Sequence, residues 1–332
     1  MNLVFSVIVP VYNRPEEVRE LLHSLCLQTY RKDFEIIIVE DGSTETSKAV
    51  IEEFGNLNIT YFYKKNTGPG DSRNYAMQRA SGNYFIILDS DCVLPKAYLS
   101  SIDTHLISNY SDFFGGPDAA ASNFTSLQKA INYSMTSLLT TGGIRGRKEA
   151  ATNFEPRSFN MGISKAAFEK SGGFGKIHPG EDPDLSIRLW NLGFKSQLIS
   201  EAYVYHKRRI SWPKFYNQVR KFGLVRPILT VWHPQTAKIT FWFPTLFTLG
   251  LFISFVMSLY GIYFPLVLVA LYFLIILGHS TFKNKSLQVG FLSVWAVLVQ
   301  FAGYGIAFAE STISIRYLKN DPRKKFPHLF FK

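Results

Sequence analysis

The strongest constraint in this sequence is a run of 44 residues, Ile239–Phe282, that contains no Asp, Glu, Lys or Arg. A second run without these residues, Ser286–Ala309, covers another 24 positions. A helix that crosses a membrane needs only about 20 apolar residues. The sequence therefore excludes an ordinary soluble protein and predicts membrane helices in its second half.

The charged residues are distributed very unevenly. The formal net charge is +11, and residues 201–332 hold 16 Lys and Arg against 3 Asp and Glu. Basic and aromatic residues interleave within residues 211–238, directly before the first apolar run. This pattern is typical of an interfacial segment on anionic lipid, so membrane lipid explains the charge better than nucleic acid does.

The apolar runs predict two or three membrane helices within residues 239–310, followed by a basic tail at 311–332. Ile239–Phe282 is long enough for two helices, and Tyr260–Pro265 supplies a break. Three crossings place the tail outside the cytosol, whereas its positive charge favours the cytosolic side. We expect a cytosolic tail and a third segment that lies along the membrane or re-enters it. Four residues weaken this segment as a lipid-facing helix: Gly290, Gln300, Gly303 and Gly305.

Residues 1–210 alternate between short apolar runs and helical patterns, which indicates one domain. Strands buried on both faces are predicted at Val4–Val9, Phe34–Val39, Ile59–Tyr63 and Tyr84–Leu88. The alternation predicts an α/β fold, a mostly parallel sheet with helices on both faces. Within residues 109–151 we expect loops and one helix, near Leu127–Leu139, over the sheet edge.

Two features favour the cytosol for this domain. Cys26 and Cys92 provide neither a disulfide framework nor a zinc spacing, which fits a reducing compartment. Met1–Pro10 lacks the basic start and the long apolar stretch of a secretory signal. We therefore expect the protein at the inner (cytoplasmic) membrane, with its N-terminal domain facing the cytosol.

Polar residues follow the predicted strands at the edge where such sheets bind ligands. Asp89 and Asp91 flank Ser90 directly after the fourth strand. Two carboxylates at this place can face one Mg²⁺ or Mn²⁺, although Asp and Ser are also ordinary turn residues. Asp41 follows the second strand, and its alternative role is that of a helix cap.

Three further patterns have a chemical and a structural interpretation. The turn Gly68–Asn74 opens a helix, so its amides and Arg73 can meet a phosphate, or it is a plain turn. Glu181 and Asp182 are crowded carboxylates that raise one another's pKa, as a general base needs, or they cap the next helix. His206 is a candidate ligand for the same cation or a structural histidine.

The order and spacing of these motifs match one family. The matching segments are Ser6–Asn13, Val39–Ser43, Asn66–Gly70, Arg73–Asn74, Leu88–Asp91, Asn160–Met161, Gly172–Phe174 and Gly180–Asp182. Over about residues 4–210 the sequence resembles the family 2 glycosyltransferases with the GT-A fold. Glu40 departs from the family pattern, in which many members have Asp, but Asp41 is in place.

The resemblance implies an enzyme that takes a sugar from a nucleotide-diphosphate sugar and inverts the anomeric centre. Residues implied to lie against the nucleotide base are Pro10, Tyr12, Asn13 and Asp41. Residues implied to contact the nucleotide or diphosphate are Gly68, Arg73, Asp89 and Ser90.

The resemblance also implies a metal site and a catalytic base. Asp91, with Asp89 and His206, would hold Mg²⁺ or Mn²⁺. Asp182 would be the catalytic base, and Glu181 would orient it.

An active site tethered to a membrane suggests a lipid-linked saccharide or a similar glycan as the acceptor, in cell-surface glycan synthesis. The first alternative is a processive polysaccharide synthase, for which Gln218–Phe222 is a degenerate form of the Gln-x-x-Arg-Trp motif. The second is a nucleotide-binding membrane scaffold or transporter without catalysis. Charged residues inside the apolar runs would mark a transport pathway, and these runs contain none.

Overall fold

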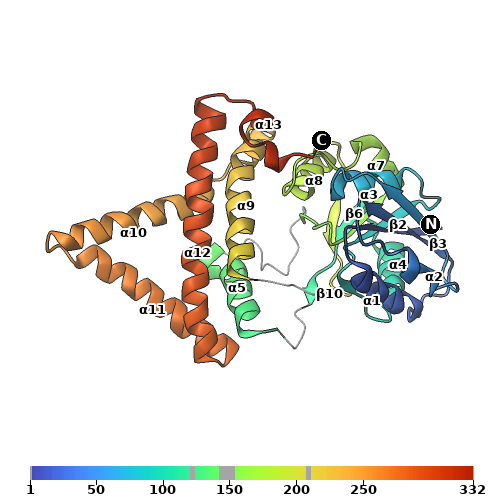
Figure 1. The fold of residues 1–332 in the computed structure, drawn as a ribbon, viewed down its shortest axis with the longest axis horizontal. Helices are drawn as coiled ribbons and strands as arrows, with labels where there is room; N and C mark the ends of the chain where they lie inside the picture. The colour runs from blue at the N-terminus through green and yellow to red at the C-terminus, as the bar shows by residue number, and fades with distance from the viewer. Residues whose placement is uncertain (1, 120–123, 142–153, 207–210, 332) are drawn as a thin grey trace. The chain divides into compact units, whose positions relative to one another are not determined.

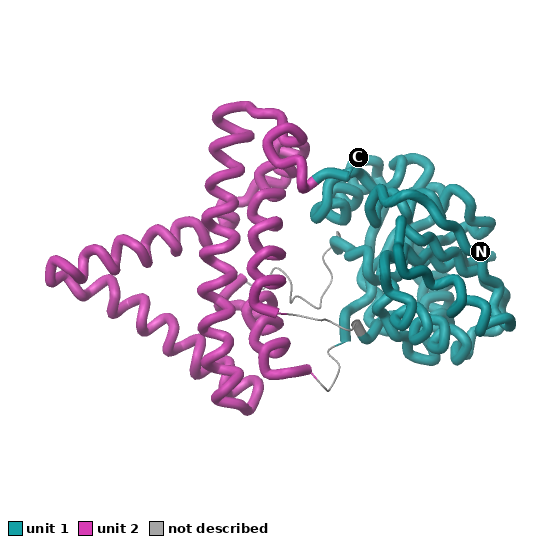
Figure 2. Tube along the Cα trace, in the orientation of Figure 1, with its two compact units in different colours: residues 1–121, 150–207, 330–332 teal, residues 122–149, 208–329 magenta. Residues whose placement is uncertain are grey.

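The computed structural model describes residues 2–119, 124–141, 154–206 and 211–331. The chain divides into two compact units (Figure 2). Unit 1 comprises residues 1–121, 150–207 and 330–332, and unit 2 comprises residues 122–149 and 208–329. Unit 1 contains the predicted sheet, and unit 2 contains the long apolar helices.

Unit 1 is organised around a seven-stranded sheet in the order β3-β2-β1-β4-β8-β6-β9. The strands are β3 (Ile59–Lys64), β2 (Phe34–Asp41), β1 (Phe5–Val11), β4 (Tyr84–Leu88), β8 (Asn160–Ser164), β6 (Phe113–Gly115) and β9 (Ser196–Leu198). The first four are mutually parallel, and β8 enters antiparallel between β4 and β6. A small second sheet joins β5 (Cys92–Val93), β10 (Val204–His206) and β7 (Asp118–Ala119). The predicted mostly parallel sheet is confirmed.

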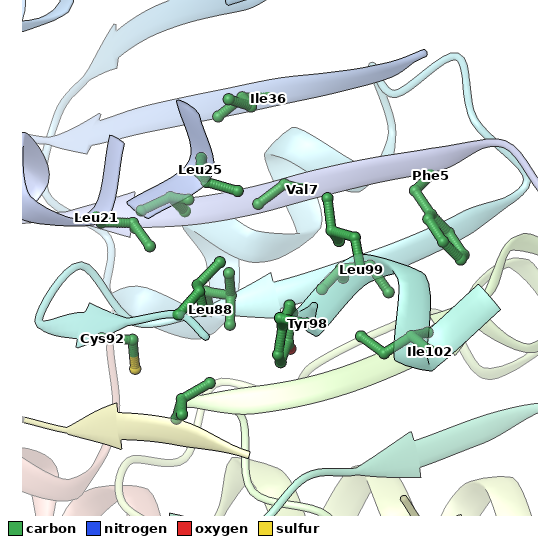
Figure 3. Packing of buried hydrophobic residues seen from close by; sticks show 14 of the residues in the cluster. Phe5, Val7, Leu21, Leu25, Ile36, Leu88, Cys92, Tyr98, Leu99 and Ile102 are labelled. Carbon is green, nitrogen blue, oxygen red and sulfur yellow. The ribbon is translucent and has the colours of Figure 1, made fainter. Parts of the chain in front are cut away.

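Alternate residues of the central strands face two apolar layers, as the pleat requires. Val7 packs with α1 (Pro15–Cys26), α2 (Lys48–Glu52) and α4 (Tyr98–Ser108). Ile8 packs with α3 (Pro69–Met77), α7 (Lys165–Ser171) and α8 (Glu181–Asn191) on the opposite face. Figure 3 shows part of the first layer, with Leu25 of α1 and Leu99 of α4 over the sheet. Both faces are therefore covered by helices.

Two expectations for this part of the chain are wrong. β3 is not buried on both faces, because it lies at the edge of the sheet with a single neighbouring strand. The helix expected near Leu127–Leu139 forms as α5 (Ser126–Thr136) and α6 (Leu138–Thr141), but it belongs to unit 2. Ile131 of α5 packs there against Phe215 and Ala296, which offer it an apolar surface within unit 2.

The described residues of unit 2 form helices. The long ones are α9 (Trp212–Trp232), α10 (Phe243–Leu259), α11 (Phe264–Asn284) and α12 (Leu287–Ser311). Shorter turns are Pro234–Thr236, Ile239–Trp242, Thr312–Tyr317, α13 (Pro322–Lys325) and Pro327–Leu329. Three described segments are long and apolar enough to cross a membrane: Ile239–Leu259, Phe264–Asn284 and Leu287–Tyr317. The predicted break lies between α10 and α11, which diverge from it (Figure 1).

Gly162, in the middle of β8, is required by the ring of Phe114. A Cβ at this position would collide with three atoms of that fully buried ring. We expect Gly162→Ala to destabilise the protein by about 1–3 kcal/mol through overpacking. The measurement is the Tm of the full chain in detergent by circular dichroism. Gly55→Ala is the control, because nothing lies within 4 Å of its added Cβ; equal losses in the two variants would contradict the packing argument.

Candidate active site

Asn13 joins the carboxyl ends of β1 and β2. Its backbone has a φ of 53°, a left-handed conformation that Asn tolerates better than most residues. Its side-chain oxygen accepts hydrogen bonds from the amides of Thr44 (2.8 Å) and Glu45 (3.0 Å), and its own amide donates to Ser43 Oγ (2.8 Å). Asn13 thus fixes the loop after β2, while the neighbouring Tyr12 presents a side chain that is 53% exposed.

Glu40, the departure from the family pattern, is a buried structural residue. Its carboxylate accepts hydrogen bonds from the Ser43 hydroxyl and from the Ser47 amide (2.9 Å). The residue before it, Val39, lies beside Pro10 in the sheet register. Glu40 therefore holds the loop after β2 in place from inside the protein. Asp41 is the acid at the end of β2.

Asp41 fastens the loop that contains Gly68. One of its oxygens accepts from Lys64 Nζ (2.6 Å) and from the Thr67 amide (3.0 Å), and the other accepts from the Gly68 amide (2.9 Å). Its side chain is nearly buried. The loop then enters α3 at Pro69, as the sequence predicts. Both oxygens of Asp41 thus accept hydrogen bonds from the protein. Its predicted contact with the nucleotide base depends on the lone pairs that remain.

Arg73 is a buried cation at the centre of the site. It donates to Asp89 Oδ1 at 2.8 Å, and its Nη1 lies 3.7 Å from Glu181 Oε1. Its guanidinium also stacks over the ring of Phe174, 5.3 Å from the centroid. Because a buried charge needs partners, Arg73 holds the turn after β4 and the start of α8 in one arrangement.

Asp89, Ser90 and Asp91 form the turn after β4, as predicted. The Asp89 side chain is 34% exposed, whereas Ser90 is buried. Asp91 forms an ion pair with Arg14 at 2.8 Å. Two carboxylates on one turn are the hard oxygen donors that Mg²⁺ or Mn²⁺ takes, so the donor set fits such an ion.

The third predicted ligand, His206, ends β10 opposite Cys92, but its side chain lies outside the described part of the structure. Among the residues that are described, no group of three or more His, Cys, Asp or Glu is arranged to hold a metal ion. The metal site therefore stays a prediction that rests on Asp89 and Asp91.

Glu181 and Asp182 begin α8 and have opposite pKa shifts. Burial and the charge of Glu181 raise the pKa of Asp182 to about 6. Its Oδ1 is buried without a hydrogen-bond partner among the described residues. Burial opposes ionisation of Glu181, but the hydrogen bond with His178 and the charges of His178 and Arg73 outweigh it, so the pKa of Glu181 is lowered. A carboxylate with a lowered pKa thus lies beside one whose pKa is raised to about 6, and two acids with pKa values pushed apart in this way suit general base catalysis.

The sequence did not identify three residues of the site. The first is His178, whose Nδ1 lies 2.8 Å from Glu181 Oε1. Its position three residues before Glu181 is the sequence signal that could have indicated this contact. Arg14 and Lys64 gave no local signal, because their partners lie 77 and 23 residues away along the chain.

The last described residues also belong to this unit. Phe330 forms a β-bridge with Ile177, and the amide of Phe331 donates to the Lys176 carbonyl at 3.0 Å. The Phe331 ring packs on Gly68, where a Cβ would collide with it. A cavity of about 110 Å³ lies between this ring, α3 and residues 174–178. The tail thus returns to the loop that Asp41 fastens.

Comparisons with known proteins identify the family of this chain. The family model for glycosyl transferase family 2 matches residues 6–172, just over half of the chain. The chain is 35% identical over 112 residues to poly(ribitol-phosphate) beta-N-acetylglucosaminyltransferase TarS of Staphylococcus aureus strain Mu50. This match covers 32% of the chain and 20% of TarS. The chain is also 35% identical over 113 residues to glycosyltransferase GlyA of Streptococcus pneumoniae serotype 4, a match that covers 33% and 16%. The matches thus span a fifth or less of these relatives.

Solved structures share the fold over most of the chain. Mannosyltransferase PcManGT from Pyrobaculum calidifontis, in complex with GDP-Man and Mn²⁺, aligns with a TM-score of 0.64 at 14% identity over 92% of this chain and 88% of that one. S. aureus TarS 1-349 in complex with UDP aligns with a TM-score of 0.50 at 19% identity over 96% and 92%. The predicted GT-A fold is therefore confirmed, and the chain belongs to glycosyl transferase family 2.

Proposed function

We propose that this glycosyltransferase is anchored in the inner membrane, faces the cytosol, and moves a sugar from a nucleotide-diphosphate sugar to a hydroxyl of a lipid-linked saccharide or a similar acceptor. In this proposal the anomeric centre is inverted and the product enters cell-surface glycan synthesis. The observation that carries the proposal is Asp182, whose pKa is raised to about 6 beside an ionised Glu181.

Asp182 acts as the base in a single displacement. Its carboxylate takes the proton of the acceptor hydroxyl while that oxygen attacks the anomeric carbon on the face opposite the diphosphate. The bond from the anomeric carbon to the diphosphate oxygen breaks in the same step. Glu181 keeps Asp182 basic by like-charge repulsion, and His178 and Arg73 keep Glu181 ionised.

The leaving diphosphate gains negative charge as its bond breaks, so positive charge near it lowers the barrier. A divalent cation held by Asp89 and Asp91 would supply that charge. Arg73 positions Asp89 through a hydrogen bond of 2.8 Å. The loop at Gly68 leads into α3 at Pro69, and the amides of the first turn of that helix suit a phosphate.

The donor class is supported by proteins of similar fold. PcManGT was solved with GDP-Man and Mn²⁺, and TarS 1-349 with UDP. We assign Tyr12 and Pro10, at the end of β1, to contact with the nucleotide base of the donor. The three apolar segments support the membrane anchor. An anchored enzyme meets acceptors that share its bilayer far more often than acceptors in solution, which favours a lipid-linked saccharide.

Replacing Asp182 by Asn tests the proposal directly. We expect turnover to fall by about two to four orders of magnitude, because a positioned base contributes this much, while donor affinity persists. The assay uses the full chain in native membranes with a panel of nucleotide sugars and measures transfer of labelled sugar to lipid-extractable material. Glu169→Gln, an exposed acid on α7, is the control and should keep full turnover. Near-normal turnover in Asp182→Asn would show that Asp182 is not the catalytic base and only caps α8.

The pH dependence gives a second test. A base with a raised pKa is protonated below it, so kcat/KM should rise with pH through an acidic limb near pH 6. Removing the neighbouring negative charge with Glu181→Gln lowers the pKa of Asp182 and should move this limb to lower pH. The position of the limb is the readout, whatever happens to the rate. A limb that does not move rejects this assignment of the pair.

The metal requirement gives a third test of the proposed function. Transfer should stop in excess chelator and in Asp91→Ala, and Mg²⁺ or Mn²⁺ should restore the chelated wild type only. Arg14→Gln removes the cation paired with Asp91 and should lower the metal concentration that gives half-maximal activity. Full activity in excess chelator would overturn the metal site.

A further inference from the structure

In unit 2, α10 and α11 join α12 at two separate places. Near one end of α12, Ser280 and Ser293 share a hydrogen bond of 2.7 Å. Near the other end, Thr245 donates to the Gly305 carbonyl at 2.8 Å. The opposite ends of α10 and α11 meet at the turn Tyr260–Tyr263 (Figure 1). The three helices therefore form a triangle whose base is α12 and whose apex is this turn.

The base of the triangle contacts polar helices along its length. In its first half, Gln288 accepts a hydrogen bond from Ser126 of α5 at 3.1 Å. In its second half, Glu310 pairs with Arg220 of α9, and Ser311 donates to the Leu224 carbonyl at 2.6 Å. The basic residues of α9 in this stretch are Lys214, Arg220, Lys221 and Arg226. These charges extend over about 18 Å of helix, so α9 and α12 cannot run side by side through hydrocarbon.

The chain leaves unit 1 before α9 and returns to it after α13. The return is fixed by the bridge between Phe330 and Ile177 and by the hydrogen bond from the Phe331 amide to Lys176. Since unit 1 lies on one side of the membrane, the helices between these points cross it an even number of times. With α12 along the surface, only α10 and α11 are left to enter the bilayer, and they enter as a pair.

The dimensions of the triangle limit how deep the apex reaches. From their contacts with α12 to the turn, α10 and α11 are each about 25 Å long, and the contacts at Ser293 and Gly305 are about 18 Å apart along α12. The apex then lies about 23 Å from α12. The hydrocarbon core is about 30 Å thick, so the apex ends inside it.

The turn itself suits an apolar environment. The amides of Tyr260, Gly261 and Ile262 donate to carbonyls of Met257 and Ser258. Pro265, which follows, has no amide to satisfy. Gly261 has a φ of 81°, which allows this tight closure. Satisfied backbone donors and the lack of any charged side chain are what hydrocarbon demands of a turn.

We propose that α10 and α11 form a re-entrant hairpin that enters the bilayer from one side and ends within the hydrocarbon, while α9 and α12 lie along the cytosolic interface. This inference rests on the proposed membrane anchor. The partner of the hairpin is the acyl chain region of the bilayer, and the enzyme is attached to one face of the membrane without spanning it.

Cysteine labelling tests this topology. In a Cys26→Ser background, where the remaining Cys92 is fully buried, the Ile262→Cys variant is treated with a membrane-impermeant maleimide on sealed vesicles of both orientations. We expect no labelling from either side and full labelling after detergent. Asn217→Cys, on the exposed face of α9, is the control and should react only from the side of unit 1. Labelling of the Ile262→Cys variant from the opposite side alone would show a spanning hairpin and overturn the proposal.

A charge at the apex gives an independent readout. We expect Ile262→Lys to lower the fraction of protein that resists alkaline extraction from membranes by at least about tenfold, because the lysine must enter hydrocarbon. Ile262→Met should keep the wild-type fraction. Equal retention of the lysine variant would place the turn in water and overturn the re-entrant hairpin. If the wild type itself is extracted, the membrane anchor fails, which is a different outcome from a spanning hairpin.

Discussion

The candidate active site depends on the burial of one cation, Arg73. Its guanidinium lies away from water and needs negative charge close by, which Asp89 and Glu181 provide from two distant parts of the chain. This requirement joins the turn after β4 to the start of α8. Arg73 also contributes to the asymmetry between the two acids of α8. Both acids are desolvated, but the hydrogen bond and charge of His178, together with the charge of Arg73, lower the pKa of Glu181, whereas burial and the charge of Glu181 raise the pKa of Asp182.

Many residues of the family motifs act on the protein itself. Asn13, Glu40 and Asp41 each hold a loop through backbone amides. Asn74 forms two hydrogen bonds with the backbone of Phe174, at 2.8 and 2.9 Å. A motif of this kind specifies the shape of the site first, because loops at the edge of a sheet need side-chain partners for their amides. The residues left to meet a ligand are then those with exposed polar or aromatic atoms, such as Tyr12 and Asp89.

The sequence predicts what is encoded locally and misses what is encoded across distance. The strands at Phe34–Asp41 and Tyr84–Leu88 follow from short runs of β-branched and aromatic residues, and the acidic start of α8 from its position after Gly180. The ion pair of Arg14 with Asp91 joins residues 77 positions apart, and no periodicity reports it. The placement of α5 in unit 2 is of the same kind. Its apolar face fits either a sheet edge or another helix, and only tertiary packing decides between them.

Three membrane crossings would place the basic tail outside the cytosol, whereas its positive charge favours the cytosolic side. The packing of α12 explains why the sequence gives these two conflicting indications. Hydropathy measures composition, and α12 is apolar because other helices cover it. Its candidate span is 44% buried, against 6% and 11% for the other two segments. The glycines that weaken it as a lipid-facing helix are its crossing points: Gly290 meets Leu277 of α11, Gly303 meets Val219 of α9, and Gly305 meets Pro244 of α10. Small residues let helix backbones approach closely, so these glycines mark α12 as the element around which unit 2 is packed.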